Sequence, residues 1–579
     1  MDAQSDISLV DLEAQQAFLK NDTVHSFSWK ELIVTVKDGQ TKKMRDLICD
    51  INGHVERGEL MALMGPSGCG KTTLLNVLAR RIPASHARVS GATLVDGMHV
   101  DNESFKLITS YVEQEDALIG SLTVQETMRF AAELSLPRSV SSSERAHRVR
   151  MLLDAFGIHG QANTLVGTPI RKGISGGQKR RLSVASQLIT CPKILFLDEP
   201  TSGLDSKASF EVISYVKKLA KRNNLIVIAS IHQPSTTTFE LFDKVLLLSS
   251  GRTCYFGPTT QVSDYFGRIG YPMPQYTNPA EFMLDVVSAD FASYKEAAVL
   301  WTLGWLVCQK IFQRKLSADV ARPDPGRVIL SLLHRSLIKS NRDIVAYGIR
   351  IVMYLGLAIL MGTVWLRLHT SQEYIRPFIN AIFFGSAFMS FMAVAYVPAY
   401  LEDRATFIKE RANGLYGPTP FILSNFLIGL PYLFLISILF SIVAYWLSNF
   451  RSSGTAFFSW VMWLFLDLVA AESFVVFVSS VFPISSSPSR SSPLRTGCGC
   501  IRLPRHDGQR ILPRVFSCGS ACHFMYQTDL ASQCQIRGTG VLEQYGYAEG
   551  RTGKWVGILI AIIAVYRLFG WIALVLRKS

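Results

Sequence analysis

The first 290 residues of this chain lack any hydrophobic run long enough to cross a membrane, and the polar, acidic N-terminus lacks a cleavable signal peptide. No basic face with a nucleic-acid-binding motif accompanies the formal net charge of +14. The cysteines in this part lack metal-ligand spacing, as expected in a reducing compartment, and are Cys49, Cys69, Cys191 and Cys254. These absences argue against a secreted protein and against nucleic acid as a partner.

Hydrophobic residues are plentiful but unevenly distributed. They make up 49% of the 579 residues, and the mean hydropathy is +0.23, which is high for a soluble protein. From residue 344 onward, apolar runs reach the ~20 residues that a bilayer requires. Lys and Arg beside the cytoplasmic ends of such spans would explain the positive charge. We expect a flexible tail over 1–24, a soluble domain over 25–290, a linker with an interfacial helix over 291–343 and a membrane domain over 344–579.

A glycine-rich loop lies between the short apolar run 60–64 and the segment 72–81, whose leucines have helical spacing. A strand, a glycine loop and a helix in this order aim backbone N–H groups and the positive helix end at one point, which suits a polyphosphate. Lys71 would reach the β- and γ-phosphates, and the Thr72 hydroxyl would hold Mg²⁺. The expected phosphate-binding residues are Gly65, Pro66, Ser67, Gly68, Cys69, Gly70, Lys71, Thr72 and Thr73.

Two further segments carry polar residues typical of a nucleotide site. An apolar strand over 193–197 ends in Asp198 and Glu199, and strand ends of this kind meet ligands in open α/β sheets. Asp198 can hold Mg²⁺ through water and Glu199 can polarise an attacking water, although a solvated turn before Pro200 is the alternative. A second anion-binding helix N-terminus is expected at Ser175, Gly176, Gly177 and Gln178.

Three more polar residues complete the pattern. Gln114 ends a short strand, Asp205 closes the tight loop 202–205, and His232 follows the buried strand 225–231. Each alone is uninformative, and a lone histidine is usually structural or exposed. In this order behind the phosphate loop, the motifs make about residues 25–290 resemble the ATPase of ATP-binding-cassette proteins.

That resemblance implies a head-to-tail pair of ATPase domains, with ATP and Mg²⁺ as cofactors. Ser175 and Gly177 of one chain would contact the γ-phosphate of ATP held by the partner's Lys71. Mg²⁺ would be held by Thr72, Gln114 and Asp198. The remaining family roles would fall on Gln114 (the link to the membrane domain), Glu199 (the attacking water), Asp205 (a contact across the dimer) and His232 (the γ-phosphate).

Two points about this domain concern an aromatic residue that would stack on adenine and a cysteine in the phosphate loop. An adenine-stacking aromatic residue usually precedes the phosphate loop, and Phe27 and Trp29 are candidates, but we expect core packing for both. Cys69 is expected to be a small residue that fits the loop. A testable hypothesis is that the helix end lowers its pKa and makes the thiol reactive.

The second part of the chain predicts a polytopic helical domain. The stretch 328–341 is amphipathic, and although an ordinary surface helix explains it equally well, the following span favours a helix at the cytoplasmic membrane interface. The charge-dense segment 402–414 is expected to be a cytoplasmic loop. Spans are expected at about 346–366, 378–399, 421–447, 455–478 and 555–576.

An ATPase placed before the spans, together with segments 402–414 and 416–418, resembles the G-type half-transporters, the white and pleiotropic-drug-resistance group. The resemblance extends to about Pro483. In that group the charged loop and the interfacial helix pass nucleotide-driven closure to the spans, a role that would fall on Glu410 and Arg411. The alternative is a charged loop that is merely solvated.

Two carboxyl groups, Asp467 and Glu472, fall inside the fourth expected span. A charge costs ~2.5–3.5 kcal/mol at the bilayer centre on insertion scales, so both should face protein or water. They could mark the substrate path, but a hydrogen bond to a neighbouring helix is the favoured interpretation.

Residues 485–514 break the family pattern, because a fifth span is expected there. Four spans before this stretch and one after it would leave Arg577 and Lys578 outside, against the positive-inside bias. We hypothesise a mis-called intron or a frameshift, which would yield a product that lacks a span. In the group the following loop is extracellular and would suit disulfides among Cys518, Cys522 and Cys534. The stretch contains Arg490, Arg495, Arg502, Arg505, Arg510 and Arg514.

The expected fold is thus an α/β P-loop ATPase domain followed by an all-α polytopic transmembrane domain. The resemblance implies ATP-driven export of a hydrophobic or amphipathic substrate, such as a lipid, sterol, drug or pigment precursor. The half-transporter would form a homodimer or a heterodimer in the lipid bilayer. The plasma membrane is the expected membrane, with the N-terminus and the ATPase domain in the cytoplasm. One alternative is a transport-defective product with an intact ATPase. The other is a non-transport ATPase, against which the bilayer-length apolar runs argue.

Overall fold

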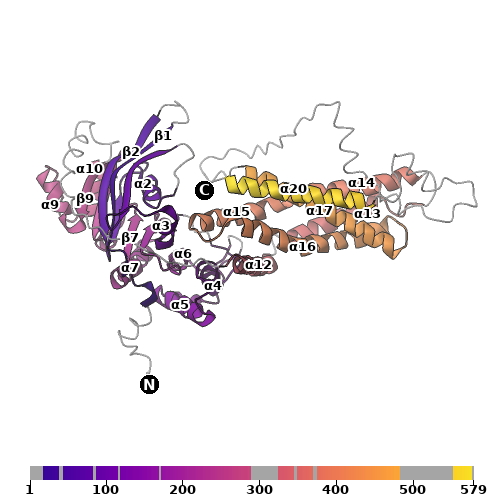
Figure 1. Cartoon of the computed structure of the whole chain (residues 1–579), viewed down its shortest axis with the longest axis horizontal. Coiled ribbons are helices and arrows are strands. Elements are labelled where there is room, and N and C mark those ends of the chain that lie inside the picture. The colour runs from indigo at the N-terminus through magenta and orange to yellow at the C-terminus, as the bar shows by residue number, and fades with distance from the viewer. Residues whose placement is uncertain are drawn as a thin grey trace, which may run out of the picture. The chain divides into compact units, whose positions relative to one another are not determined.

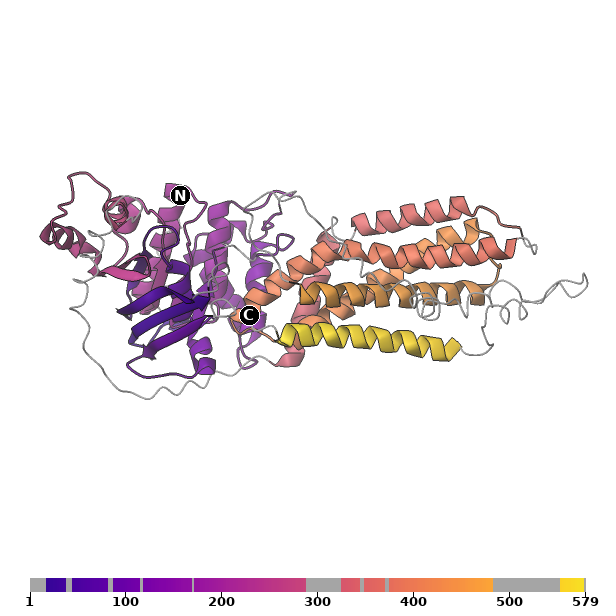
Figure 2. The same cartoon turned by 90° about the horizontal axis from the view of Figure 1, so that it is seen from above.

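The computed structural model describes residues 17–37, 44–81, 87–114, 118–168, 171–287, 324–343, 348–369, 374–482 and 552–576. The chain forms two compact units (Figures 1 and 2). The first unit contains the chain up to Ser331 together with Thr406–Gly417, and the second contains Leu332–Ala405 and the chain from Pro418. The stretch 485–514, the cysteines that follow it, Arg577 and Lys578 lie outside the described residues.

A six-stranded sheet in the order β5-β6-β7-β3-β8-β9 forms the centre of the first unit (Figure 1). Neighbouring strands run parallel, except that β9 pairs antiparallel with β8 at the edge. The innermost strands are buried on both faces, which explains their continuous apolar sequences. The strands are β3 (Leu60–Met64), β5 (Thr109–Val112), β6 (Ile194–Leu197), β7 (Ile226–Ser230), β8 (Lys244–Ser249) and β9 (Arg252–Pro258).

Side chains of successive strand residues point to opposite faces of this sheet, and each face has its own core. In β3, Leu60 and Ala62 pack with α4 (Val124–Ser135), α5 (Ser142–Ala155), α6 (Gly176–Leu188) and α7 (Ser206–Asn223). Met61 and Leu63 instead pack with α2 (Lys71–Leu78) and α3 (Asn102–Ile108). The central strands are therefore held from both sides, and their carboxyl ends stand at one edge.

A second, antiparallel sheet in the order β2-β1-β4 covers the α2 side of the core. Its strands are β1 (Ser26–Lys37), β2 (Met44–Glu56) and β4 (Arg88–Val95). Phe27 and Trp29 of β1 are both 0% exposed, and the ring centroid of Phe27 lies 5.9 Å from that of Phe196. The expected core packing of both aromatic residues is confirmed.

The folded domain begins earlier than expected. Leu19, Asn21 and Val24 are buried, and the Asn21 amide donates hydrogen bonds of 2.8 Å to the Val24 carbonyl and 2.9 Å to the Asn224 carbonyl. A flexible tail over 1–24 is therefore too long, because one buried asparagine ties this segment to the end of α7.

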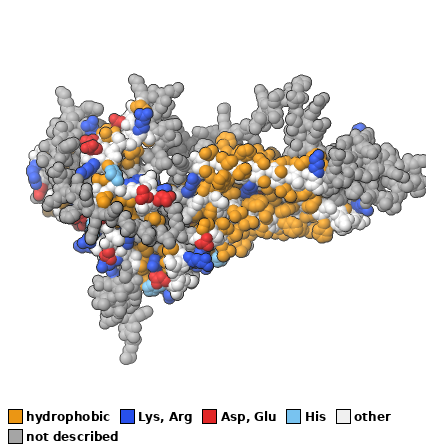
Figure 3. Space-filling model, viewed as in Figure 1, with side chains coloured by type: hydrophobic (Ala, Val, Ile, Leu, Met, Phe, Trp, Pro, Cys, Tyr) orange, Lys and Arg blue, Asp and Glu red, His pale blue; other side chains and the backbone are white. Residues whose placement is uncertain are grey.

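Five helices lie side by side in the second unit, in both views (Figures 1 and 2). They are α13 (Ile349–Val364), α14 (Ile375–Met392), α16 (Pro418–Leu447), α17 (Gly454–Val481) and α20 (Thr552–Leu576). Each overlaps one of the expected spans, although α14 ends at Met392 and the expected second span continued to about 399. Within the described ranges, four helical segments are long and apolar enough to cross a membrane, whereas α13 is shorter. Hydrophobic side chains cover the visible face of this bundle (Figure 3).

The expected loop at 402–414 is wrong, because most of it is helical. Helix α15 (Val397–Ala412) runs through this segment and ends before Gly414, whose φ of +77° suits a helix C-terminus. Its charged residues are good helix formers, and the charge density that suggested a loop does not oppose a helix. The amphipathic stretch forms α12 (Pro325–Arg342), and its Lys339 ammonium pairs with Asp403 of α15 at 2.7 Å.

Both carboxyl groups inside the bundle are hydrogen-bonded to neighbouring helices. Asp467 Oδ2 accepts hydrogen bonds of 2.7 Å from the hydroxyls of Ser386 and Ser390 on α14. Glu472 Oε2 accepts from Arg350 Nη2 of α13 at 2.7 Å. The hydrogen-bonded interpretation is confirmed for Asp467, and Glu472 has a charged partner that the sequence analysis did not anticipate.

Candidate active site

The phosphate loop connects β3 to α2, as the sequence predicts. Gly65 has a φ of +152°, and a Cβ atom there would lie 2.3 Å from the Leu248 carbonyl oxygen, so the backbone has room only for glycine. Gly70, with a φ of +103°, precedes α2 and provides no side-chain cap, which leaves the first helical N–H groups available to an anion. The Lys71 ammonium donates to the carbonyls of Gly65 (2.7 Å) and Pro66 (3.0 Å) and therefore lies inside the loop.

Asp198 follows β6 at the edge where the parallel strands end. Its Oδ1 accepts from the hydroxyls of Ser230 (2.7 Å) and Thr72 (3.4 Å), and its Oδ2 accepts from the Tyr111 hydroxyl (3.1 Å). The pairing of β6 with β7, and of β7 with β3, brings these residues together. A carboxylate beside a threonine hydroxyl forms the oxygen donor set that Mg²⁺ prefers, so Thr72 and Asp198 fit this ion.

Glu199 has an unusual backbone conformation for a residue with a side chain. Its φ is +43°, a region that costs of order 1–3 kcal/mol and is concentrated at functional sites. The Ser230 hydroxyl accepts from the Glu199 backbone N–H at 2.8 Å, and Arg180 Nη2 donates to the Glu199 carbonyl at 3.0 Å. The Gln114 amide donates to Glu199 Oε2 at 2.7 Å. Two residues predicted from separate motifs, Gln114 and Glu199, are thus in direct contact.

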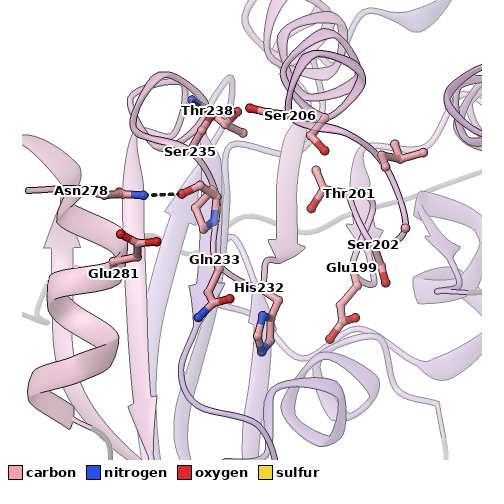
Figure 4. A pocket seen from close by; sticks show the side chains of 14 residues that line it. Glu199, Thr201, Ser202, Ser206, His232, Gln233, Ser235, Thr238, Asn278 and Glu281 are labelled. Carbon is pink, nitrogen blue, oxygen red and sulfur yellow. Dashed lines mark hydrogen bonds between the residues drawn. The ribbon is translucent and has the colours of Figure 1, made fainter.

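A cavity of about 500 Å³ opens beside Glu199 and His232 (Figure 4). The two side chains follow neighbouring strands, β6 and β7, and extend toward the same side of the view. Gln233, next to His232, also has a positive φ, of +42°. On the other side of the cavity, the Asn278 amide donates to the Pro234 carbonyl at 2.9 Å. The Glu199 carboxylate and the His232 imidazole can therefore contact the same bound group.

The Ser-Gly-Gly-Gln motif forms the start of α6 and does not line this cavity, although a Cβ atom at Gly176 would lie 3.6 Å from the lining residue Leu204. Ser175 caps the helix through the backbone N–H of Gln178 at 3.3 Å, and Gln178 Oε1 accepts from the Ser175 N–H at 2.9 Å. A Cβ atom at Gly177 would lie 3.2 Å from the Ala208 Cβ, so the helix start packs closely on α7. Asp205 caps α7 through the Ala208 N–H at 2.8 Å. None of Ser175, Gly176, Gly177, Gln178 and Asp205 lines the cavity.

Two functional neighbours of the site were missed by the sequence analysis. Arg180, which is 3% exposed, donates to the carbonyls of Glu113 (2.8 Å), Gln114 and Glu199 and so holds two predicted site segments together. Tyr111 contacts Asp198 directly. Arg180 lies two residues after Gln178 and Tyr111 lies three residues before Gln114, so proximity to a predicted motif could have identified both.

The surroundings of Cys69 argue against the hypothesis of a reactive thiol. The side chain is 6% exposed, and burial raises the pKa of the thiol, with the Lys71 charge lowering it only in part. The helix end that should lower this pKa is outweighed by loss of solvent. The expectation that Cys69 is a small residue filling the loop agrees with this burial.

The segment Thr406–Gly417 contacts the ATPase core within the first unit. The Asn413 amide donates to the Tyr111 carbonyl (3.2 Å) and to Gln187 Oε1 (3.0 Å), and Arg81 Nη2 donates to Asn413 Oδ1. Glu410, one of the two expected coupling residues, accepts from the Tyr416 hydroxyl. Asn413, which was not predicted as a coupling residue, contacts the core at Tyr111, and Lys409 pairs with Glu113 at 3.6 Å.

Family profiles match both parts of the chain. The ABC transporter profile matches residues 48–202, and the ABC-2 type transporter profile matches residues 327–486. A solved structure of cbiO1 from Clostridium perfringens, part of the ABC transporter complex cbiONQ, is 25% identical, with a TM-score of 0.36 over 43% of this chain and 94% of that chain.

Relatives match most of the length. ABC transporter G family member 11 of Arabidopsis thaliana is 31% identical over 94% of this chain and 85% of its own length. ABC transporter G family member 1 of Petunia hybrida is 34% identical over 84% of this chain and 80% of its own. The chain belongs to the ABC transporter G family and is a multi-pass membrane protein that binds nucleotide and couples ATP hydrolysis to transport.

Proposed function

We propose that this chain is a half-transporter that pairs with a second half-transporter and exports a hydrophobic or amphipathic substrate. The observation that carries the proposal is the placement of Glu199. It follows the end of β6 in a strained conformation, contacts Gln114 and shares a cavity with His232. Neither Ser175 and Gly177 nor Lys71 and Thr72 line that cavity, so the pairing is supported by the family of the relatives and not by the cavity.

In this proposal, the chain's own residues divide the work on ATP. The phosphate loop 65–73 binds the phosphates through its N–H groups and Lys71. Bound Mg²⁺ would supply positive charge against the β- and γ-phosphates, held by Thr72, Asp198 and Gln114. Glu199 orients and polarises the attacking water, and His232 supports the γ-phosphate. General-base assistance of this kind contributes about 10²–10⁴-fold in rate.

Closure of two ATPase domains on ATP would bias the membrane domain. To move a two-state balance from 1:99 to 99:1, the ligand must prefer one state by ~5.5 kcal/mol. A γ-phosphate between the phosphate loop of one chain and Ser175 and Gly177 of the other offers such a preference, because those contacts exist only in the closed dimer. Hydrolysis then removes the preference, and Glu410 and Arg411 would help to pass the change to the spans.

The placement in the cell follows from the same reasoning. The ATPase domain needs cytoplasmic ATP, so the N-terminal part would lie in the cytoplasm, with the spans in the plasma membrane. Lipids, sterols, drugs and pigment precursors remain the candidate substrates, since the apolar bundle suits each of them. A purified pair tested for substrate-stimulated ATP hydrolysis against such a panel would separate these classes.

The run of arginines at 485–514 favours a second candidate, a chain with an active ATPase that does not transport. Vesicle transport measured beside ATP hydrolysis distinguishes the two. Sequencing of the transcript across this region decides whether the reading frame is genuine. Hydrolysis without transport would support the second candidate, and transport by the chain as written would exclude it.

The proposal is tested by Glu199→Gln in the full-length chain. We expect ATP turnover to fall about 10²-fold or more, and ATP-bound dimers to accumulate, because the closed state is no longer released. Glu281→Gln is the matched control, since Glu281 lines the same cavity without following β6. Chromatography with ATP measures the dimer. Unchanged turnover in Glu199→Gln, or turnover by isolated monomers equal to that of dimers, would refute the paired site.

A further inference from the structure

Tyr111 occupies an unusual position next to the proposed magnesium site. Its side chain is 4% exposed, and its hydroxyl lies 3.1 Å from Asp198 Oδ2. The ring packs beside Phe196 of β6, with centroids 6.5 Å apart. The phenol O–H donates to the Asp198 carboxylate, which can only accept.

This hydrogen bond fixes the plane of the Asp198 carboxylate. The terminal torsion of an aspartate is broad, so one donor on one oxygen leaves the carboxylate free to turn. Ser230 and Thr72 donate to Oδ1, and Tyr111 is the donor to Oδ2. With donors on both oxygens, the carboxylate is held with Oδ1 toward the Thr72 hydroxyl, the other side chain of the proposed ion site.

The other side of Tyr111 contacts the segment Thr406–Gly417. The Tyr111 carbonyl accepts from the Asn413 amide at 3.2 Å. The Arg81 guanidinium lies 3.9 Å from the centre of the Tyr111 ring, pairs with Glu113 at 2.8 Å and also donates to Asn413. Asn413 and Arg81 thus hold the backbone and the ring of the residue whose hydroxyl orients Asp198.

We propose that Tyr111 is a positioning residue that sets the Asp198 carboxylate for Mg²⁺ and makes this setting depend on Asn413. The inference rests on the proposed role of Asp198 as a magnesium ligand. Its consequence is that docking of Thr406–Gly417 strengthens magnesium binding directly, through one residue, and not only through Gln114. A tyrosine that merely fills the core would affect stability and leave the magnesium dependence unchanged.

The test compares Tyr111→Phe with Tyr255→Phe in the full-length chain in detergent. Tyr255 is a matched control, because it is 5% exposed and its hydroxyl donates to the Pro258 carbonyl at 2.7 Å, away from the site. Unfolding midpoints are measured in ATP while Mg²⁺ is titrated, and again with ATP and EDTA. ATP hydrolysis is titrated with Mg²⁺ in parallel.

For Tyr111→Phe we expect the half-saturating Mg²⁺ concentration to rise about tenfold in both titrations, since hydrogen bonds to charged groups are among the stronger ones. The rate at saturating Mg²⁺ should stay near that of the unaltered chain, and the midpoint in EDTA should match that of Tyr255→Phe. An unchanged magnesium dependence in Tyr111→Phe would overturn the inference.

Asn413→Ala tests the second half of the proposal. We expect a smaller rise in half-saturating Mg²⁺, and no further rise when the change is added to Tyr111→Phe, because both act on one contact chain. Full additivity would overturn the dependence on Asn413. Asp198→Asn distinguishes failure of the proposed ion site from failure of the positioning role of Tyr111. If it leaves the magnesium dependence unchanged, the proposed ion site itself fails, whereas if only Tyr111→Phe has no effect, the positioning role alone fails.

Discussion

The buried ion pair between Arg350 and Glu472 offers the sharpest test of how the helix bundle is held together. The side chains are 5% and 3% exposed, and Nη2 lies 2.7 Å from Oε2. The guanidinium also lies 4.9 Å from the centre of the Tyr396 ring. Removing one partner of such a pair leaves a buried charge and costs about 3–5 kcal/mol. Replacing both by apolar residues removes the uncompensated charge, so the double change should cost less than either single change.

The two single changes should differ in how much they destabilise the helix bundle. Arg567 of α20 donates to Ser473, the residue after Glu472, at 3.0 Å. When Glu472 is replaced by Leu, the guanidinium groups of Arg350 and Arg567 lose this carboxylate, whereas replacing Arg350 by Met leaves Glu472 close to Arg567. We therefore expect Glu472→Leu to be the more destabilising. Asp467→Asn is the matched control, because an amide oxygen can still accept from Ser386 and Ser390.

The measurement is the fraction of full-length chain that remains monodisperse in detergent after heating. The expected order of midpoints, from lowest to highest, is Glu472→Leu, Arg350→Met, and then the double variant close to the unaltered chain. Asp467→Asn should cost about 1 kcal/mol or less, the usual net worth of a neutral hydrogen bond. Single variants as stable as the unaltered chain, or a double variant that loses the sum of both, would refute the reasoning.

Two further predictions concern the ATPase. Arg180→Lys should lower ATP turnover about tenfold or more, with little change in the affinity for ATP, because an ammonium cannot reproduce the guanidinium fork that bridges the Glu113 and Glu199 carbonyls. Steady-state kinetics beside nucleotide binding check this, and unchanged turnover would contradict it. Cys69 should alkylate slowly at pH 7.5 and faster as the pH rises beyond 9, since burial raises the thiol pKa above its ordinary 9.0 and only the thiolate reacts. Mass spectrometry of the loop peptide measures the rate, and rapid labelling at neutral pH would contradict the prediction.

The motifs of the ATPase were readable from the sequence because each is a local pattern. The order of apolar run, glycine loop and helix at 60–81 determines β3, the loop and α2 through steric rules that act within a few residues. The same holds for Asp198 and Glu199, which directly follow a buried strand. The apolar runs of the second part reveal helices for a similar reason, since length and hydrophobicity are local properties.

The partners of these residues were decided by tertiary structure alone. Parallel pairing of β5, β6 and β7 brings Tyr111 to Asp198, and nothing in the local pattern of either strand specifies that contact. Burial likewise opposes the lowered thiol pKa that was hypothesised for Cys69, because solvent loss depends on which parts of the chain surround the thiol. The charged segment 402–414 was misjudged since charge density does not distinguish a loop from a helix whose polar residues pack against α12.

The sequence by itself therefore determined the class of protein: an ATPase fold, its glycine-rich loop, the two carboxylates proposed to act on ATP and a set of apolar helices. Only the tertiary structure decided how its charges are satisfied, as in the pairs Arg350–Glu472 and Lys339–Asp403 and in the contacts of Arg180. The physical reason is that the two kinds of interaction act over different separations along the chain. Backbone sterics and hydrophobic periodicity act between near neighbours in the chain, whereas these two ion pairs and the Arg180–Glu113 hydrogen bond join groups more than 60 residues apart.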